Sequence, residues 1–219
     1  MCVCVRVCTL GNTIFMHRHV FLYTAALMMT VGTYIAKGQK PDIKRTWHWY
    51  FGYGAGIDFI SGSPVAVTNG ALHTGEGAGA ISDTAGNLLF YTDGDTVWNK
   101  NHLPMPNGWG LMGCGNNLGS STQSGLVIPW PGSDSLFFIF TTDCGENSLA
   151  AGLRYSVVDI SQNAGMGDVV TKNILLYGNG ITDSLALEGL AATYHCNGTD
   201  VWLMSHKYNT NCWRAYKIT

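Results

Sequence analysis

The chain has few charged residues and little that predicts a helix. Only 12% of its 219 residues are charged, whereas soluble domains carry about 25%. With 46% hydrophobic residues, a charge-driven disordered protein is excluded. Capped stretches with a sustained helical period are lacking. Glycine is abundant, at 28 residues, but no G-X-Y period runs through the chain, so collagen is excluded. A turn-rich globular chain remains.

Basic residues are also scarce. Beyond residue 38 the chain has nine basic and fourteen acidic residues, and its only arginines there are Arg45, Arg154 and Arg214. Because no basic stripe is available for a phosphate backbone, we expect no nucleic-acid partner. The few arginines also argue against sialidase-type chemistry, which needs an arginine cluster on the substrate carboxylate. No G-x-S-x-G elbow occurs. We therefore predict no catalytic residues and no cofactor.

Residues 1–38 have the features of a secretory signal peptide. The basic residue Arg18 precedes an apolar run over 19–36, and small residues lie just before Gln39. This pattern predicts a signal helix with cleavage after Gly38. An uncleaved anchor is the alternative, although the run is shorter than the ~20 residues of a spanning helix. The first fifteen residues fit an n-region poorly, so Met16 is the start we favour. Membrane contact is expected only through this segment.

Short β-type runs alternate with turn signals after a linker at residues 39–46. This alternation predicts an all-β fold. The clearest strands are expected over 87–92, 125–130, 135–141, 153–160, 190–196, 200–206 and 212–218. Turn dipeptides lie between them, since Gly and Asn accept the positive φ of tight turns. Asn197-Gly198, for example, predicts a two-residue hairpin turn.

A repeated plan runs through residues 47–219. Segments 81–94, 126–143 and 191–207 each contain a strand, a polar turn and a second strand, and a third strand is expected after each. A meander repeated at about 50 residues is typical of β-propeller blades. Since closed propellers have about four to eight blades, residues 47–219 would form a partial propeller of about three to four blades, the start of a longer one. A β-sandwich is the alternative; it would need more even turn spacing.

Four cysteines lie beyond residue 38: Cys114, Cys144, Cys196 and Cys212. Export would permit disulfides. The predicted hairpins place Cys196 and Cys212 about 20 Å apart, beyond the ~7 Å limit for a bridge. A Cys114–Cys144 bridge is the only one we entertain, with free thiols as the alternative. The spacing of His195, Cys196, His206 and Cys212 matches no zinc motif, so we predict no metal site.

The long, nearly uncharged loop at 105–123 is the best candidate for a binding edge. Most aromatic residues are expected to fill the faces between blades, but Trp109 lies among glycines and asparagines, where its ring can stack on a sugar or a partner. Asp93 and Asp95 are weaker candidates, because aspartates at turns usually bond local backbone amides. The candidate binding residues are Trp109, Asn107, Asn116, Asn117, Asp93 and Asp95.

Several motifs in collinear order resemble a known group of proteins. They include EGAGAISDTAGNLLFYTDGDTVWNKNH at 76–102, STQSGLVIPWPGS at 121–133, GLRYSVVDIS at 152–161 and HCNGTDVW at 195–202. Over 47–219 the chain resembles the N-terminal propeller of large exported surface proteins of the Bacteroidota, which are gliding-motility-associated or PKD-repeat proteins sorted by type IX secretion. PKD-like repeats and a sorting domain are not found in this sequence. The resemblance implies a surface location and names no catalytic residue.

These observations favour an exported recognition or adhesion scaffold, secreted or on the outer cell surface. Its partners would be glycans or proteins bound at the polar loops. A propeller-type polysaccharide hydrolase or lyase is the alternative, and a purely structural spacer is a third interpretation.

Overall fold

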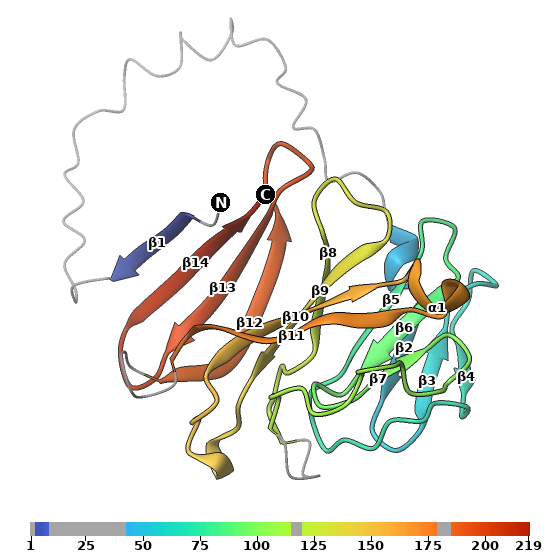
Figure 1. The fold of residues 1–219 in the computed structure, drawn as a ribbon, viewed down its shortest axis with the longest axis horizontal. Coiled ribbons are helices and arrows are strands. Elements are labelled where there is room, and N and C mark those ends of the chain that lie inside the picture. The colour runs from blue at the N-terminus through green and yellow to red at the C-terminus, as the bar shows by residue number, and fades with distance from the viewer. Residues whose placement is uncertain (1–2, 9–42, 115–119, 179–184) are drawn as a thin grey trace, which may run out of the picture.

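The structure is a computed structural model that describes residues 3–8, 43–114, 120–178 and 185–219. As predicted, the fold is all-β, with four small antiparallel sheets that follow one another in chain order (Figure 1). The first sheet contains β2 (His48–Phe51), β3 (Ala55–Asp58) and β4 (Val65–Val67), and the second contains β5 (Gly79–Ser82), β6 (Leu88–Thr92) and β7 (Val97–Asn99).

The third and fourth sheets are longer. The third contains β8 (Leu126–Pro129), β9 (Leu136–Thr142), β10 (Leu153–Asp159) and β11 (Asp168–Tyr177). The fourth contains β12 (Ala186–Tyr194), β13 (Val201–Lys207) and β14 (Cys212–Ile218), with β1 (Val3–Cys8) paired to the outer edge of β14. The helical elements are single turns: η1 (Ile43–Thr46), η2 (Gly145–Asn147) and α1 (Gln162–Gly165). In the described ranges no helix has the length and apolarity to cross a bilayer.

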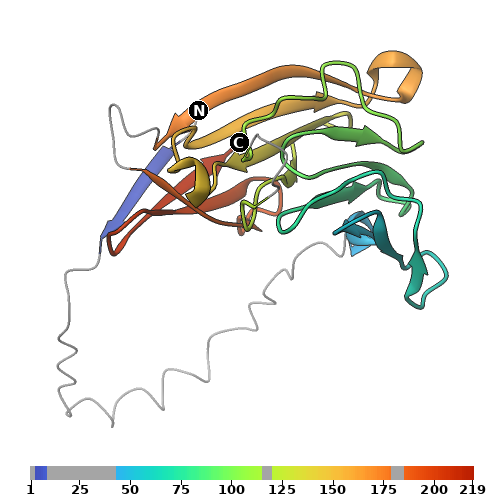
Figure 2. The same cartoon turned by 90° about the horizontal axis from the view of Figure 1, so that it is seen from below.

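Each sheet is a meander whose first strand contacts the first strand of the next sheet. β2 lies against β5, β5 against β8, and β8 against β12. The strand order within every sheet then runs outward from this line of first strands. Figure 2 shows the stacked sheets from a second side. This arrangement resembles successive propeller blades, while closure into a ring is not shown.

The hydrophobic core is divided among the faces between neighbouring sheets. Tyr50 stacks on Tyr91 between the first and second sheets, with ring centroids 4.5 Å apart. Phe90 meets Phe137 edge-on between the second and third sheets. The third core packs Leu153 and other residues of the third sheet against Leu203 and other residues of the fourth. Alternating side chains therefore place aromatic or aliphatic residues on both faces of the inner sheets, as the sequence predicted for most aromatics.

Glycines allow the first strands to approach closely. A Cβ on Gly79 of β5 would overlap the carbonyl oxygen of Gly125, which precedes β8. Gly125 itself has φ of 85°, a conformation that other residues rarely adopt. Part of the glycine excess is thus required by packing between sheets as well as by turns.

The turn at Asn197-Gly198 differs from the prediction. Asn197-Gly198 does not form a two-residue turn: Tyr194 pairs with Val201, and the His195 amide donates to the carbonyl of Asp200, which leaves a longer loop. Only Gly198 has a positive φ, whereas a type I′ turn needs it at both central residues. The Asn197 side-chain oxygen instead accepts the amides of Thr199 and Asp200, which closes an Asx-type loop.

The N-terminal predictions are only partly covered. The expected signal helix and Met16 lie outside the described residues. Strand β1 precedes Met16, so it belongs to the chain only if translation begins at Met1 and residues 3–8 are retained. Residues 43–46 of the predicted linker form η1, which packs against β5 and places Arg45 over the ring of Phe137. The described end of the linker is therefore part of the folded body.

Candidate functional site

A pocket of about 420 Å³ opens where the first strands of the four sheets converge. It is lined by η1, by β2, by the start of β5 and the loop before it, by the start of β8 and the loop before it, and by Leu190 of β12. Every sheet thus contributes to one cavity. Its size lies in the range of small-molecule sites, which are about 300–1,000 Å³.

Strand β2 supplies an aromatic wall. Its side chains alternate, so that His48 and Tyr50 are buried and Trp49 and Phe51 remain 50% and 41% exposed. His48 bonds Ser82 of the second sheet at 3.0 Å. Trp49 is fixed in orientation because its indole N–H donates to the carbonyl of Thr46 at 2.8 Å. The pocket therefore has a preorganised aromatic surface.

Behind the polar side of the pocket, a bulge in β12 presents Glu188. Ala186 pairs with Lys207 and Leu190 with Ser205, so three residues of β12 oppose one of β13. Such bulges redirect side chains. The Glu188 carboxylate accepts the amide and hydroxyl of Thr122, at 2.9 and 2.8 Å, and the amide of Gly145 at 2.7 Å. Burial by itself would raise the pKa of Glu188, but these donors together hold it below its ordinary value.

Thr122 and Gln123 line the pocket and connect it by hydrogen bonds to β12. The Thr122 hydroxyl lies 3.1 Å from Glu76 as well as 2.8 Å from Glu188. It has a single proton, so it can satisfy only one of the two carboxylates at a time. The Gln123 side-chain oxygen accepts the amide of Leu190 at 2.6 Å, which leaves its NH₂ group as a donor at the pocket. The pocket thus combines an acceptor, a donor and an aromatic wall.

The loop predicted from the sequence lies elsewhere, beside the edge of the second sheet. Val97 of β7 donates to the carbonyl of Gly108, so residues 103–111 follow that strand. Trp109 is 59% exposed, and Lys172 of β11 donates to its carbonyl at 2.9 Å. Asn107 donates to Asp168 at 3.0 Å. Trp109 therefore projects from a segment pinned to β11, while Asn116 and Asn117 lie outside the described residues.

Asp93 and Asp95 form the turn between β6 and β7, next to this loop. Asp93 accepts the amides of Asp95 and Thr96, as expected for a turn aspartate. The Asp95 carbonyl accepts the amide of Leu111, which joins the turn to the loop. Burial raises the pKa of Asp93, and burial together with the Asp93 charge raises that of Asp95. The structure brings Asp95 near the loop and leaves both aspartates outside the pocket.

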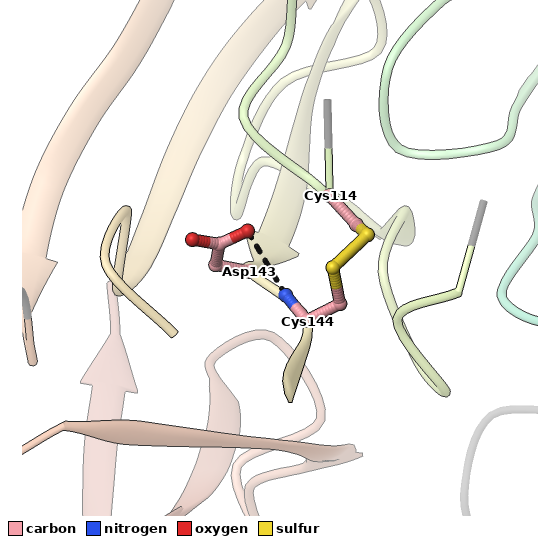
Figure 3. A group of neighbouring side chains, drawn as sticks. All are labelled: Cys114, Asp143 and Cys144. Carbon is pink, nitrogen blue, oxygen red and sulfur yellow. Dashed lines mark hydrogen bonds between the residues drawn. A yellow bond between two sulfur atoms is a disulfide. The ribbon is translucent and has the colours of Figure 1, made fainter. Parts of the chain in front are cut away.

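Cys114 and Cys144 form a disulfide (Figure 3). Asp143, beside them, accepts the amide of Cys144 at 2.9 Å. These three residues are close enough to resemble a metal site, but the sulfurs are bonded to each other and are not free thiolate ligands. Cys212 is disulfide-bonded too, so the expectation that Cys114–Cys144 is the only bridge was wrong. Register places Cys212 opposite Cys8 of β1. Cys196 is free and exposed.

Sequence reasoning missed the pocket. It did not consider Trp49, Glu76, Thr122, Gln123 and Glu188 as a group. These residues are up to 139 positions apart in the chain, and their meeting depends on the convergence of four sheets. One signal was available: Trp49 and Phe51 alternate with His48 and Tyr50 in a short strand, which indicates an aromatic face not used by the core.

Comparison of the chain with family models, with curated proteins and with solved structures finds no match.

Proposed function

We propose that this chain is a non-catalytic recognition or adhesion scaffold whose ligand binds in the pocket between the first strands. The observation that carries the proposal is the pocket itself, which joins the fixed Trp49 indole to the polar groups of Glu76 and Gln123. A concave site with an aromatic wall and a few fixed polar groups is typical of ligand recognition.

The architecture we propose is a partial β-propeller. Its support is the outward strand order of all four sheets and the contact between successive first strands. We further propose export to an oxidising compartment, either secreted or at the cell surface, where gliding-motility-associated adhesion is one role. The disulfide between Cys114 and Cys144 supports this location weakly, because disulfides persist mainly outside the cytosol.

The exposed Trp109 is a second recognition surface in this proposal. Its ring offers area at little cost in entropy, and the bonds from Lys172 and Asn107 to their partners fix the loop around it. A glycan or protein partner could bind there independently of the pocket.

A binding measurement tests the function. The full chain is immobilised and exposed to arrayed glycans and to purified surface-protein partners, together with Trp49→Ala, Trp109→Ala and Trp213→Ala variants. Loss of binding with Trp49→Ala places the ligand in the pocket, and loss with Trp109→Ala places it on the loop. Trp213 is 43% exposed on the fourth sheet and serves as the matched control. Absence of any specific binding would refute recognition and favour a structural spacer.

A polysaccharide hydrolase or lyase is the second candidate. Burial and the nearby Asp93 charge raise the pKa of Asp95, which is the direction that a general acid requires. Turnover of labelled polysaccharides, abolished by Asp95→Asn, would support this function and contradict the first. Glu188, which lies behind the pocket, is poorly suited to the role of general acid, since its hydrogen bonds lower its pKa despite partial burial.

A further inference from the structure

We infer that the pocket between the first strands selects uncharged sugar residues and rejects anionic ones. This inference rests on the proposed recognition function and specifies its ligand class. It follows from three properties of the lining: a fixed aromatic surface, a carboxylate acceptor close to an amide donor, and the sign of the charge.

The aromatic surface suits the apolar face of a sugar ring. Trp49 is half exposed and its indole N–H is already used by Thr46, so the ring presents area to a ligand without offering that donor. Phe59 lies against the indole at 5.4 Å between centroids and further restricts it. Phe51, two residues along the same strand, extends the wall. A ring held in place in the free protein loses little entropy when it binds.

The polar groups have hydrogen-bonding capacity that the protein does not fill. Thr122 gives its proton to Glu188 at the shorter distance, and Glu188 is also held by the amides of Thr122 and Gly145. The Glu76 oxygen 3.1 Å from the same hydroxyl shares that single proton with Glu188, so Glu76 keeps the capacity to accept from another donor. A ligand hydroxyl would supply that donor to Glu76.

Gln123 provides the complementary group. Its oxygen is fixed by the Leu190 amide, so its orientation is set and its NH₂ can donate to a ligand oxygen. Sugar hydroxyls both donate and accept, which is what a neighbouring carboxylate and amide together require. An aliphatic or aromatic ligand would leave these groups unpaired, at a cost in affinity.

The charge of the pocket distinguishes neutral from acidic sugars. Glu76 lines it and Glu188 lies directly behind Thr122, whereas neither lysine nor arginine is among the lining residues that the structure describes. A uronate or sialic acid would meet these carboxylates with no lysine or arginine of the lining to compensate them. At close range, like charges disfavour binding substantially.

The test uses the full chain on an array that carries both neutral and acidic glycans, followed by calorimetric titration of the strongest neutral glycan. We expect neutral glycans to bind and acidic glycans of the same backbone to bind at least about tenfold more weakly. Trp49→Ala should weaken the neutral glycan about tenfold by removing the stacking surface. Gln123→Glu, which keeps the oxygen for Leu190 and removes the donor, should weaken it as well.

Matched controls separate this inference from general damage and from the proposed function. Trp213→Ala and Glu146→Gln change exposed residues outside the pocket and should leave the affinity unchanged. Near-ultraviolet circular dichroism verifies that each variant is folded. Preference for acidic glycans, or neutral binding that survives Trp49→Ala and Gln123→Glu, would overturn the inference. If that surviving binding is lost with Trp109→Ala, recognition stands and only the pocket's ligand class fails. If no glycan binds while a protein partner does, the inference fails and recognition again stands.

Discussion

The disulfide between Cys114 and Cys144 should supply a large share of the stability of the chain. The two cysteines are 30 residues apart in the sequence, and in the chain-entropy description a cross-link closing a loop of that length contributes about 3–4 kcal/mol by restricting the unfolded chain. Both cysteines are almost fully buried. The appropriate perturbation is the double substitution Cys114→Ala/Cys144→Ala, because a reductant would also attack the bond of Cys212.

The folded structure around the disulfide indicates that nearly all of this free energy should be lost in the double variant. Asp143 is 1% exposed and accepts the amides of Cys144 and Ala151 and the side-chain amide of Asn147. These bonds hold the turn in place without the disulfide, so the substitution acts mainly on the unfolded state. Urea unfolding, followed by tryptophan fluorescence, should therefore show a loss of about 3–4 kcal/mol with little change in the m-value.

The control is Cys196→Ala, which removes an exposed free thiol and should change the free energy of unfolding by less than about 0.5 kcal/mol. A loss below about 1 kcal/mol in the double variant would refute the reasoning. It would mean that the loop from 114 to 144 is already restricted in the unfolded chain, or that the bond strains the folded one.

Three further changes test other parts of the structure. The pKa of Glu188 is lowered on folding, so its carboxylate adds stability above its ordinary pKa of about 4.3. That contribution disappears as the pH falls through the folded pKa. Glu188→Gln should thus be less stable than wild type at pH 7, and the difference should shrink as the pH is lowered below about 4.3, measured by urea titration at each pH. Phe90 is buried between two sheets, so Phe90→Ala should lower the free energy of unfolding by about 3–5 kcal/mol. Leu103 is 60% exposed, so Leu103→Ala should lower it by less than about 0.5 kcal/mol. Equal losses in the two variants would contradict the assigned core. Gly79→Ala should lower the thermal midpoint and Gly189→Ala should not, since only at Gly79 would a Cβ overlap backbone.

The strands that the sequence predicted best are those with strong β-formers between clear turns. Residues 135–141 and 212–218 were expected as strands and are found as β9 and β14, shifted by one residue or not at all. Their periodicity is local, so it survives without tertiary information. The residues that close the turns were also identifiable, since Asp93 bonds the amides that follow it.

Strand β11 was not predicted, although it has ten residues. Its sequence, DVVTKNILLY, mixes polar and apolar residues without regular alternation, and its pairing with β10 has several register shifts. At Asn173 the backbone has a positive φ, and the side chain bonds the carbonyl of Gly110 in the neighbouring loop. Pairing with β10 and these bonds define the strand, and neither can be read from local periodicity.

The pocket was beyond sequence prediction for a related reason. Trp49 is exposed on one face of β2, whereas Tyr50 on the opposite face stacks on Tyr91 of the next sheet. Glu188 faces Thr122 only because β12 bulges where it contacts the third sheet. Each of these side chains obtains its role from a sheet that is distant in the sequence.

One covalent bond supports both surfaces that we propose for recognition. Cys114 ends the described part of the loop that carries Trp109, and Cys144 directly precedes Gly145, whose amide holds Glu188. Glu188 in turn fixes Thr122 at the pocket. The disulfide therefore links the segment that carries Trp109 to the segment that holds Glu188 behind the pocket. A stack of small sheets has little core per sheet, so a cross-link between the segments that carry the two proposed surfaces raises the stability of the fold on which both depend.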